Sequence, residues 1–433
     1  MVPRITWNLA RLALSIGAAA ALLAACGESQ PLIGAPGSMP QTRALAARPN
    51  GADYKVVYSF GGGSSDGADP EAGLIDMGGT LYGTTSAGGS YSCDYYENSG
   101  CGTAFSITLG GTEKVLHNFA NGADGATPYA PLIGLKGTLY GTTYFGGSYA
   151  CYGSSYASCG TIFSITPSGA EKVLYSFGGS SGGGAYPLAG LIGVDGTLYG
   201  TTNRGGDFFS RHGYAAFGTV FSVTTSGTET VLHSFGSHHD GARPGLAGLI
   251  NVGGKLYGTT TSGGRNGRGT VFSITLGGGE KVLHSFGKGT DGAHPAATLI
   301  ELKGELYGTT SMGGARGVGT VFSITPAGTE KVLHSFGKGT DGAHPHAPLT
   351  ELKGKFYGTT LAGGSGPCSG DYNGCGTVFS ITPDGREKVL YSFEDTPDGD
   401  WPQGDLLNVE GILYGTTMFG GTHNVGTVFS LKP

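Results

Sequence analysis

The sequence predicts an all-β fold, a seven-bladed β-propeller of four-stranded antiparallel blades, over residues 53–433. Three observations carry this prediction. Seven successive units each show four short strand-like segments separated by glycine-rich turns. The last unit lacks its fourth segment, and a copy of that segment stands alone ahead of the first unit. The tetrapeptide Tyr-Gly-Thr-Thr occurs once per unit, beginning at Tyr82, Tyr140, Tyr199, Tyr257, Tyr307, Tyr357 and Tyr414.

The first 25 residues have the composition of a secretory signal peptide. Arg4 and Arg11 precede an apolar run that ends at Leu22, and Leu23-Ala24-Ala25-Cys26 follows. This tetrapeptide resembles the lipobox of bacterial lipoproteins. The resemblance implies that cleavage leaves Cys26 as an acylated first residue, so that the membrane is a partner through this lipid. An ordinary signal peptide and an uncleaved anchor are the alternatives.

Residues 26–52 separate the expected acylated cysteine from the repeats. They are rich in Pro, Gly, Ala and Ser and lack periodic apolar residues, which predicts a flexible tether. Gly27 stands where an aspartate would favour retention in the inner membrane of a Gram-negative host. The resemblance therefore implies a lipid-anchored protein of the cell envelope, on the outer membrane and facing either the periplasm or the surface.

The unit from residue 295 to 336 shows the strand pattern most clearly. Apolar and β-branched residues occupy 299–302, 306–310, 319–325 and 331–336, and turn residues such as Lys303-Gly304 separate them. A single meander of this kind cannot bury both of its faces, whereas blades packed around a common axis can. The repeat therefore favours a propeller.

The two ends of the repeat region predict how the ring closes. The last unit stops after residues 426–431, and residues 54–60 are the orphan copy of the missing fourth strand. Pairing these segments in one sheet removes two exposed edges and leaves the orphan strand outermost. An open β-solenoid is the alternative, but it leaves both the orphan strand and the truncated unit unexplained.

Several recurrent strings resemble the GloVer tandem-repeat family of bacterial surface proteins, which are described as having a choice of anchor. The strings are Leu-Tyr-Gly-Thr-Thr, Gly-Gly, Gly-Thr-Val-Phe-Ser-Ile-Thr-Pro and Val-Leu-His-Ser-Phe, and they cover residues 54–433. The resemblance implies a repeat domain delivered to the cell envelope, here by a lipid. It implies no known activity.

Composition argues against one class of partner. The 433 residues include 86 glycines and 13% charged residues, and the formal net charge is −6. No basic stripe is present to supply the electrostatic term of nucleic-acid binding. We therefore expect a monomeric propeller that binds no nucleic acid.

Any binding site is expected on one face of the ring. In a meander the loops after strands two and four open on the same face, whereas the other face has only tight turns. The loops after the second strand are rich in aromatic residues in the first three units. Flat aromatic rings can stack on sugars or anchor a protein, but they can equally pack on one another to order glycine-rich loops. The candidate binding residues are Tyr91, Tyr95, Tyr96, Tyr144, Phe145, Tyr149, Tyr152, Tyr156, Phe208, Phe209, His212 and Tyr214.

Six cysteines form three pairs, each of which brackets one long loop. The second cysteine of each pair immediately precedes the Gly-Thr that opens the third strand, so each pair is expected to close its own loop in an oxidising compartment. Zinc is the competing interpretation, but no histidine or second cysteine pair stands at zinc-finger spacing. The predicted disulfides are Cys93–Cys101, Cys151–Cys159 and Cys368–Cys375.

Polar residues of the loops are attributed to structure. Asp-Gly-Ala-x-Pro recurs after the fourth strand and is typical of turns, and one carboxylate per loop is a poor calcium cage. Histidine and tyrosine interchange at one position of the fourth strand, as at His117 and Tyr58, which favours a half-buried hydrogen-bonding site over a ligand set. We therefore predict no catalytic residue, no metal site and no cofactor.

The sequence favours a non-enzymatic scaffold that presents disulfide-braced aromatic loops to a glycan or a protein. A second hypothesis is a polysaccharide lyase or glycosidase with two carboxyl groups at the propeller mouth, drawn from Asp94, Glu97, Asp207 and Asp371. A third is a purely structural surface protein.

Overall fold

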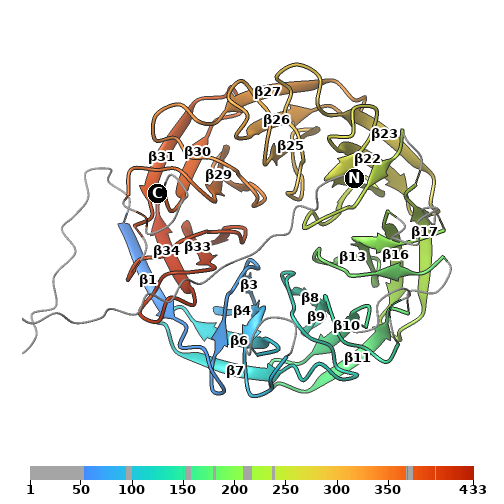
Figure 1. Cartoon of the computed structure of the whole chain (residues 1–433), viewed down its shortest axis with the longest axis vertical. Coiled ribbons are helices and arrows are strands. Elements are labelled where there is room, and N and C mark those ends of the chain that lie inside the picture. Colours follow the sequence, from blue (N-terminus) through green and yellow to red (C-terminus); the bar gives the residue numbers. More distant parts are fainter. Residues whose placement is uncertain are drawn as a thin grey trace, which may run out of the picture. The chain divides into compact units, whose positions relative to one another are not determined.

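The computed structural model describes residues 53–93, 100–149, 151, 158–178, 182–207, 217–236, 239–366, 368, 374–394 and 396–433. These residues form seven four-stranded antiparallel sheets arranged as the blades of a β-propeller (Figure 1). The predicted fold class is therefore confirmed. The predicted signal peptide, tether and Cys26 lie outside the described residues. Within the described ranges, no helix has the length and apolar character needed to cross a bilayer.

The strands of each blade follow one another outward from the axis (Figure 1). Blades one to three comprise β3 (Ile75–Asp76), β4 (Thr80–Thr85), β6 (Thr103–Thr108) and β7 (Glu113–Asn118); β8 (Ile133–Leu135), β9 (Thr138–Thr143), β10 (Thr161–Ile165) and β11 (Glu171–Ser176); and β13 (Ile192–Val194), β14 (Thr197–Thr202), β16 (Thr219–Thr224) and β17 (Glu229–Ser234). Blades four to six comprise β19 (Ile250–Val252), β20 (Lys255–Thr260), β22 (Thr270–Thr275) and β23 (Glu280–Ser285); β24 (Ile300–Leu302), β25 (Glu305–Thr310), β26 (Thr320–Ile324) and β27 (Glu330–Ser335); and β28 (Thr350–Leu352), β29 (Lys355–Thr360), β30 (Thr377–Ile381) and β31 (Glu387–Ser392). Blade seven comprises β32 (Leu407–Val409), β33 (Ile412–Thr417), β34 (Thr427–Lys432) and β1 (Asp53–Ser59).

The strands of blade five agree with the predicted segments to within one residue at each end. The hairpin between β24 and β25 turns through Lys303 at a φ of 54° and Gly304 at a φ of 83°. Two successive positive φ values match the twist of a two-residue hairpin, which explains why glycine recurs at the second turn position. The turns between the first and second strands are therefore short, so they do not form long loops that could build a binding site.

The ring closes as predicted. β1 pairs antiparallel with β34, from Asp53 opposite Lys432 to Ser59 opposite Thr427, and it is the outermost strand of blade seven (Figure 1). Blade seven is also bonded to blade one, because the Thr416 hydroxyl donates to the Ala72 carbonyl at 2.9 Å. The closed ring leaves the outermost strand of each blade as its edge.

Phenylalanine pairs connect every blade to the next. The phenylalanine that follows each outermost strand is fully buried, and its ring meets a third-strand phenylalanine of the next blade in an edge-to-face arrangement. The centroids are 5.1–5.4 Å apart. The pairs are Phe60–Phe105, Phe119–Phe163, Phe177–Phe221, Phe235–Phe272, Phe286–Phe322, Phe336–Phe379 and Phe393–Phe429.

The Tyr-Gly-Thr-Thr motif is explained by its contacts. A Cβ on Gly258 would lie 2.7 Å from the Phe272 ring, so glycine is required here for space. The second threonine of each motif shares a hydrogen bond of 2.7–2.9 Å with a threonine of the third strand, as Thr260 does with Thr270. The motif therefore fixes the second strand to both the core and its neighbour.

The junction between blades six and seven differs from the other blade junctions. Strand register places Tyr54 opposite Leu431, where the other six outermost strands place a glutamate opposite the equivalent residue. Tyr54 stacks on Tyr391 of blade six, with centroids 3.9 Å apart and an interplanar angle of 9°. At this junction Tyr54 therefore stands where the other blades have a glutamate, and its ring packs on that of Tyr391.

Candidate functional site

The loops after the second and fourth strands lie on one face, as the meander predicts. In blade one, β2 (Gly67–Ala68) pairs with β5 (Ala87–Gly88). The same contact is made by β12 (Gly184–Ala185) with β15 (Arg204–Gly205) and by β18 (Gly241–Ala242) with β21 (Ser262–Gly263). Single bridges such as Ala293 with Met312 replace it in the other blades. These pairs hold the loops in a fixed frame around the axis.

One residue of this frame adopts a strained backbone in every blade. It precedes the loop proline and has a φ of 54–59°, a region that side chains other than glycine rarely adopt. Glycine would be less strained, and this chain contains 86 glycines, yet none occupies the position. All seven blades therefore have a residue with a side chain at this position, although its backbone conformation is strained. The residues are Asp69, Thr127, Tyr186, Arg243, His294, His344 and Trp401.

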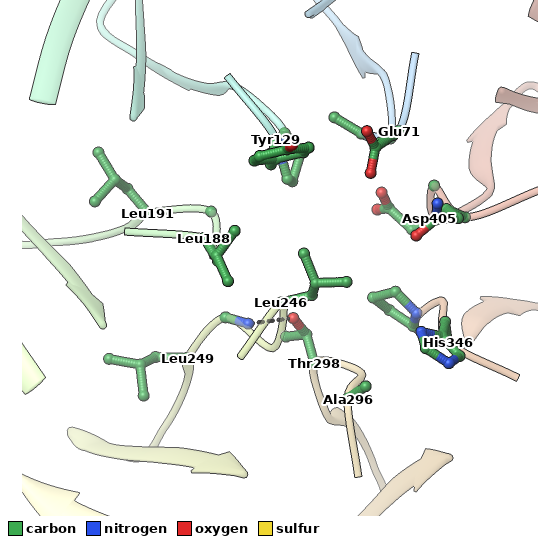
Figure 2. A pocket seen from close by; sticks show the side chains of 18 residues that line it. Glu71, Tyr129, Leu188, Leu191, Leu246, Leu249, Ala296, Thr298, His346 and Asp405 are labelled. Carbon is green, nitrogen blue, oxygen red and sulfur yellow. Dashed lines mark hydrogen bonds between the residues drawn. The ribbon is translucent and has the colours of Figure 1, made fainter. Parts of the chain in front are cut away.

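A cavity of about 200 Å³ opens between the blades at the axis (Figure 2). Two positions of the repeat line it in every blade. They are defined relative to the leucine that directly precedes the innermost strand: one lies three residues before this leucine, and the other lies one residue before it. The first axial ring consists of Glu71, Tyr129, Leu188, Leu246, Ala296, His346 and Gln403. The second axial ring consists of Gly73, Pro131, Gly190, Gly248, Thr298, Pro348 and Asp405.

The residues of the axial rings differ from one copy of the repeat to the next. The leucine after them is the same in all seven units, and alanine occupies the position between the rings in six. The first axial ring nevertheless contains an acid, a phenol, aliphatic side chains, an imidazole and an amide. The packing leucine is thus the same in each blade, whereas the residues that line the axis differ. As a result, seven similar blades enclose a cavity whose sides differ in chemistry.

The cavity has a polar side and an apolar side (Figure 2). Blades six, seven and one contribute His346, Asp405 and Glu71, whose polar groups face the cavity. Blades three and four contribute leucines, among them Leu188 and Leu246. The Asp405 carboxylate occupies the space beside Gly73, where a Cβ would lie 1.5 Å from its Oδ1, so glycine at this position admits the acid.

Burial sets the protonation of the polar side. Desolvation by burial raises the pKa of Glu71 to about 8, against the opposing hydrogen bond from Ser86 Oγ at 2.8 Å. Desolvation by burial raises the pKa of Asp405 to about 6 and lowers the pKa of His346 to about 4. At pH 7 Glu71 and His346 are therefore mostly neutral, and Asp405 is mostly ionised.

An aromatic cluster adjoins the cavity. Tyr144 contacts Tyr129 of the first axial ring at a centroid distance of 5.5 Å, Phe145 at 4.5 Å and Tyr186 at 4.9 Å. Arg204 lies over the Tyr186 ring at 5.9 Å. Two predicted binding residues, Tyr144 and Phe145, thus meet two aromatic residues that sequence reasoning did not select, and together they form a half-buried surface beside the axis.

Two further predicted binding residues stand apart from this cluster. Tyr91 is 52% exposed and Tyr149 is 59% exposed. Tyr149 packs over Gly178 beyond the outermost strand β11, away from the axial rings. The remaining predicted binding residues lie outside the described residues; they are Tyr95, Tyr96, Tyr152, Tyr156, Phe208, Phe209, His212 and Tyr214.

The three predicted disulfides are present. Cys93–Cys101, Cys151–Cys159 and Cys368–Cys375 each join the two ends of one loop, with Cα atoms 5.1–5.4 Å apart. The backbone carbonyls of Cys101, Cys159 and Cys375 accept hydrogen bonds from the strained pre-proline residues of the next blade. Each disulfide therefore braces the loop and the frame around the axis together.

Of the four acids predicted at the propeller mouth, the structure describes only Asp207. Asp207 is exposed, accepts a hydrogen bond of 3.5 Å from Ser234 near the outermost strand β17 and is not among the cavity-lining residues. Asp94, Glu97 and Asp371 lie outside the described residues. Sequence reasoning missed Glu71 and Asp405, and it did not select His346 as a binding residue. Aligning the seven units and selecting the positions that differ would have found them.

Comparison with known proteins assigns the family. The Gloeobacter/Verrucomicrobia repeat matches residues 44–217 and 208–369, three quarters of the chain. The chain belongs to this repeat family. The GloVer resemblance seen in the sequence is thereby supported for the repeat, whereas the match says nothing of the lipobox or the anchor. No curated protein matches the sequence of this repeat protein.

Some solved structures are similar to this repeat protein at low sequence identity. A candidate 6-phosphogluconolactonase of Bacteroides uniformis is 14% identical with a TM-score of 0.48, and the alignment covers 81% of this chain and 92% of that one. Puromycin hydrolase is 11% identical with a TM-score of 0.47, covering 80% and 50%. The tricorn protease is 12% identical with a TM-score of 0.38; the match covers 80% of this chain, which spans 27% of that protein's length.

Proposed function

We propose that the axial cavity binds the end of a glycan and that the protein is a non-enzymatic, lipid-anchored receptor of the cell envelope. One observation carries the proposal, namely that the repeat varies at the two axial rings while it keeps its packing positions. The cavity is smaller than the roughly 300–1,000 Å³ pockets that enclose drug-sized ligands, so it suits one or two terminal residues of a longer chain.

The lining supports a sugar over an apolar ligand. Tyr129 and the adjoining Tyr144 offer ring faces on which a pyranose can stack. Asp405, His346 and Gln403 offer hydrogen-bond acceptors and donors to hydroxyl groups, and the leucines of the opposite side pack against the C–H face of the sugar. The loop aromatics Tyr91 and Tyr149 lie apart from the axial cavity, so a glycan end bound in the cavity is not expected to contact them.

Substitutions at the axis are expected to weaken glycan binding. After a glycan array selects a ligand, calorimetry on the full chain should show that Tyr129→Ala and Asp405→Asn each lower affinity by about tenfold or more, the equivalent of about 1.4 kcal/mol. Tyr149→Ala is the matched control and is expected to leave affinity within about twofold. A loss with Tyr149→Ala and none with Tyr129→Ala would move the site to the braced loops and refute the axial assignment.

The pH dependence of binding gives an independent readout. The Glu71 carboxyl group is neutral below its pKa of about 8 and can donate a hydrogen bond to a sugar oxygen, so affinity is expected to fall as the pH rises through 8. Glu71→Gln keeps a donor and should remove this dependence while retaining binding at pH 7. A pH profile unchanged by Glu71→Gln would contradict the assigned role.

A glycosidase is the second candidate at the same cavity. The observation that favours it is the pair of buried acids with separate pKa values, about 8 for Glu71 and about 6 for Asp405. Chromatography of the glycan after incubation separates the two candidates, because a receptor returns it intact. Release of shortened products that Glu71→Gln abolishes would establish the enzyme instead.

The envelope location is a separate proposal that rests on the sequence around Cys26. In a Gram-negative host, the full chain is expected to partition into the detergent phase of a Triton X-114 extraction and to incorporate labelled palmitate. Cys26→Ser should move it to the aqueous phase without label. A Cys26→Ser chain that remains in the detergent phase would show that lipid on this cysteine is not the anchor.

A further inference from the structure

The junctions between blades contain a recurrent polar group that the axial site does not use. In four blades a histidine of the outermost strand hydrogen-bonds an aspartate seven residues later, at Nε2–Oδ2 distances of 3.0–3.2 Å. This contact agrees with the hydrogen-bonding role predicted from the sequence. Both partners are mostly buried; in the pair His334–Asp341 the side chains are 18% and 9% exposed.

A glutamate of the following blade completes this group. It is the first residue of each outermost strand from β7 to β31. Its Oε1 atom is buried and has no hydrogen-bond partner in any of six junctions. At each of these junctions one buried carboxylate oxygen therefore lacks a hydrogen-bond donor. The glutamates are Glu113, Glu171, Glu229, Glu280, Glu330 and Glu387.

At two junctions the three side chains converge. One nitrogen or oxygen atom from each of His233, Asp240 and Glu280 lies within 4.8 Å of the others, and His334, Asp341 and Glu387 repeat the arrangement. We propose that these two junctions bind divalent transition-metal ions of the zinc class, each ion joining two adjacent blades. One imidazole and two carboxylates form a ligand set that zinc accepts, with a fourth position left for water.

The three groups at each junction lie close enough together to share one ion. Tetrahedral zinc ligands that each lie about 2.0–2.2 Å from the ion are about 3.4 Å from one another. In the two groups the His–Asp distances are 3.1 and 3.0 Å, and all three atoms lie within 4.8 Å of one another. A carboxyl–carboxylate hydrogen bond would require an O···O distance of about 2.5–3.0 Å, and Glu280 and Glu387 make none through Oε1. A cation bound at this position would coordinate the unpaired glutamate Oε1 atom and balance the charge of the two carboxylates.

The chain contains its own comparison sites. Tyr58, Asp66 and Glu113 keep both carboxylates but replace the imidazole with a phenol that donates to Asp66 at 2.9 Å. At the next tyrosine junction, Glu229 interacts with Tyr175 and glycine stands in place of the aspartate. Tyrosine is therefore tolerated at the histidine position of this fold, and it removes the softer ligand. This makes histidine-to-tyrosine the natural test substitution.

The experiment measures bound metal on the full chain in a Cys26→Ser background, which removes the thiol outside the repeats. After treatment with EDTA, zinc is titrated in competition with a chromophoric chelator, and about two tight equivalents are expected. His334→Tyr should retain about one equivalent and His233→Tyr/His334→Tyr none, whereas His423→Ala, an exposed histidine away from the junctions, should retain both. Circular dichroism checks that each variant is folded.

Two further readouts distinguish ligation from a structural effect. Glu387→Gln preserves shape and is expected to weaken one of the two sites by about tenfold or more while the fold is unchanged. Zinc should raise the thermal midpoint of the Cys26→Ser parent but not that of the double tyrosine variant, because binding joins adjacent blades. Two equivalents retained by the double variant, or fewer than about half an equivalent bound by the parent, would overturn the proposal.

Discussion

Phe60→Ala is expected to lower the free energy of unfolding by about 3–5 kcal/mol. Phe60 is fully buried, and its ring meets Phe105 of blade one edge-to-face at 5.1 Å. Truncation removes the buried ring and leaves a cavity between blades seven and one. Because Phe60 directly follows β1, the substitution also weakens the attachment of the strand that closes the ring.

Phe286→Ala is the matched control for this effect. Phe286 makes the same contact with Phe322 at 5.1 Å, but at a junction within the continuous chain. Urea unfolding should show a comparable loss of stability for both variants. Limited proteolysis should cut near residues 53–60 only in Phe60→Ala, because only this segment can detach without unfolding a whole blade. A loss below about 1 kcal/mol for Phe60→Ala would contradict the role of this junction.

Gly258→Ala is expected to destabilise the fold by about 2–3 kcal/mol or more. The added Cβ would lie 2.7 Å from Phe272 Cζ and 2.9 Å from Leu249 Cδ2, and both neighbours are held in the core of blade four. The φ of Gly258 is not in the left-handed region, so the effect is one of space and not of backbone conformation.

Gly277→Ala in the same blade separates this effect from a general loss of glycine flexibility. A Cβ on Gly277 would meet nothing within 4 Å, and its φ is also outside the left-handed region. Its unfolding free energy is expected to stay within about 0.5 kcal/mol of the parent. Equal destabilisation by the two substitutions in urea titrations would refute the packing explanation of the Tyr-Gly-Thr-Thr motif.

The architecture could be predicted because it is encoded locally and repeated. Alternation, turn residues and the orphan segment at 54–60 fixed the strands, their order and the closure. The β-bulge in each outer pair was not predicted, as between Val321 and Phe322 opposite His334 and Val332. Bulges depend on the pairing partner and on the twist of the outer edge, which a single strand sequence does not express.

The candidate site was predicted only in part. The loops after the second and fourth strands lie on one face as predicted, and Tyr144 and Phe145 contact Tyr129 of the first axial ring or its neighbours. Glu71 and Asp405 were missed because each follows a turn and belongs to no motif; only the ring brings them to one cavity. The junction glutamates were missed for a similar reason, since Glu387 meets Asp341 across two blades that are separate in sequence.

A crystal structure of the full chain with its bound glycan tests the axial site most directly. The terminal sugar should lie in the cavity against Tyr129, with a hydroxyl group within hydrogen-bonding distance of Glu71 or Asp405 and its apolar face toward Leu188 and Leu246. A sugar bound only over Tyr91 or Tyr149, with the axial rings unoccupied, would contradict the assignment of the site to the axis.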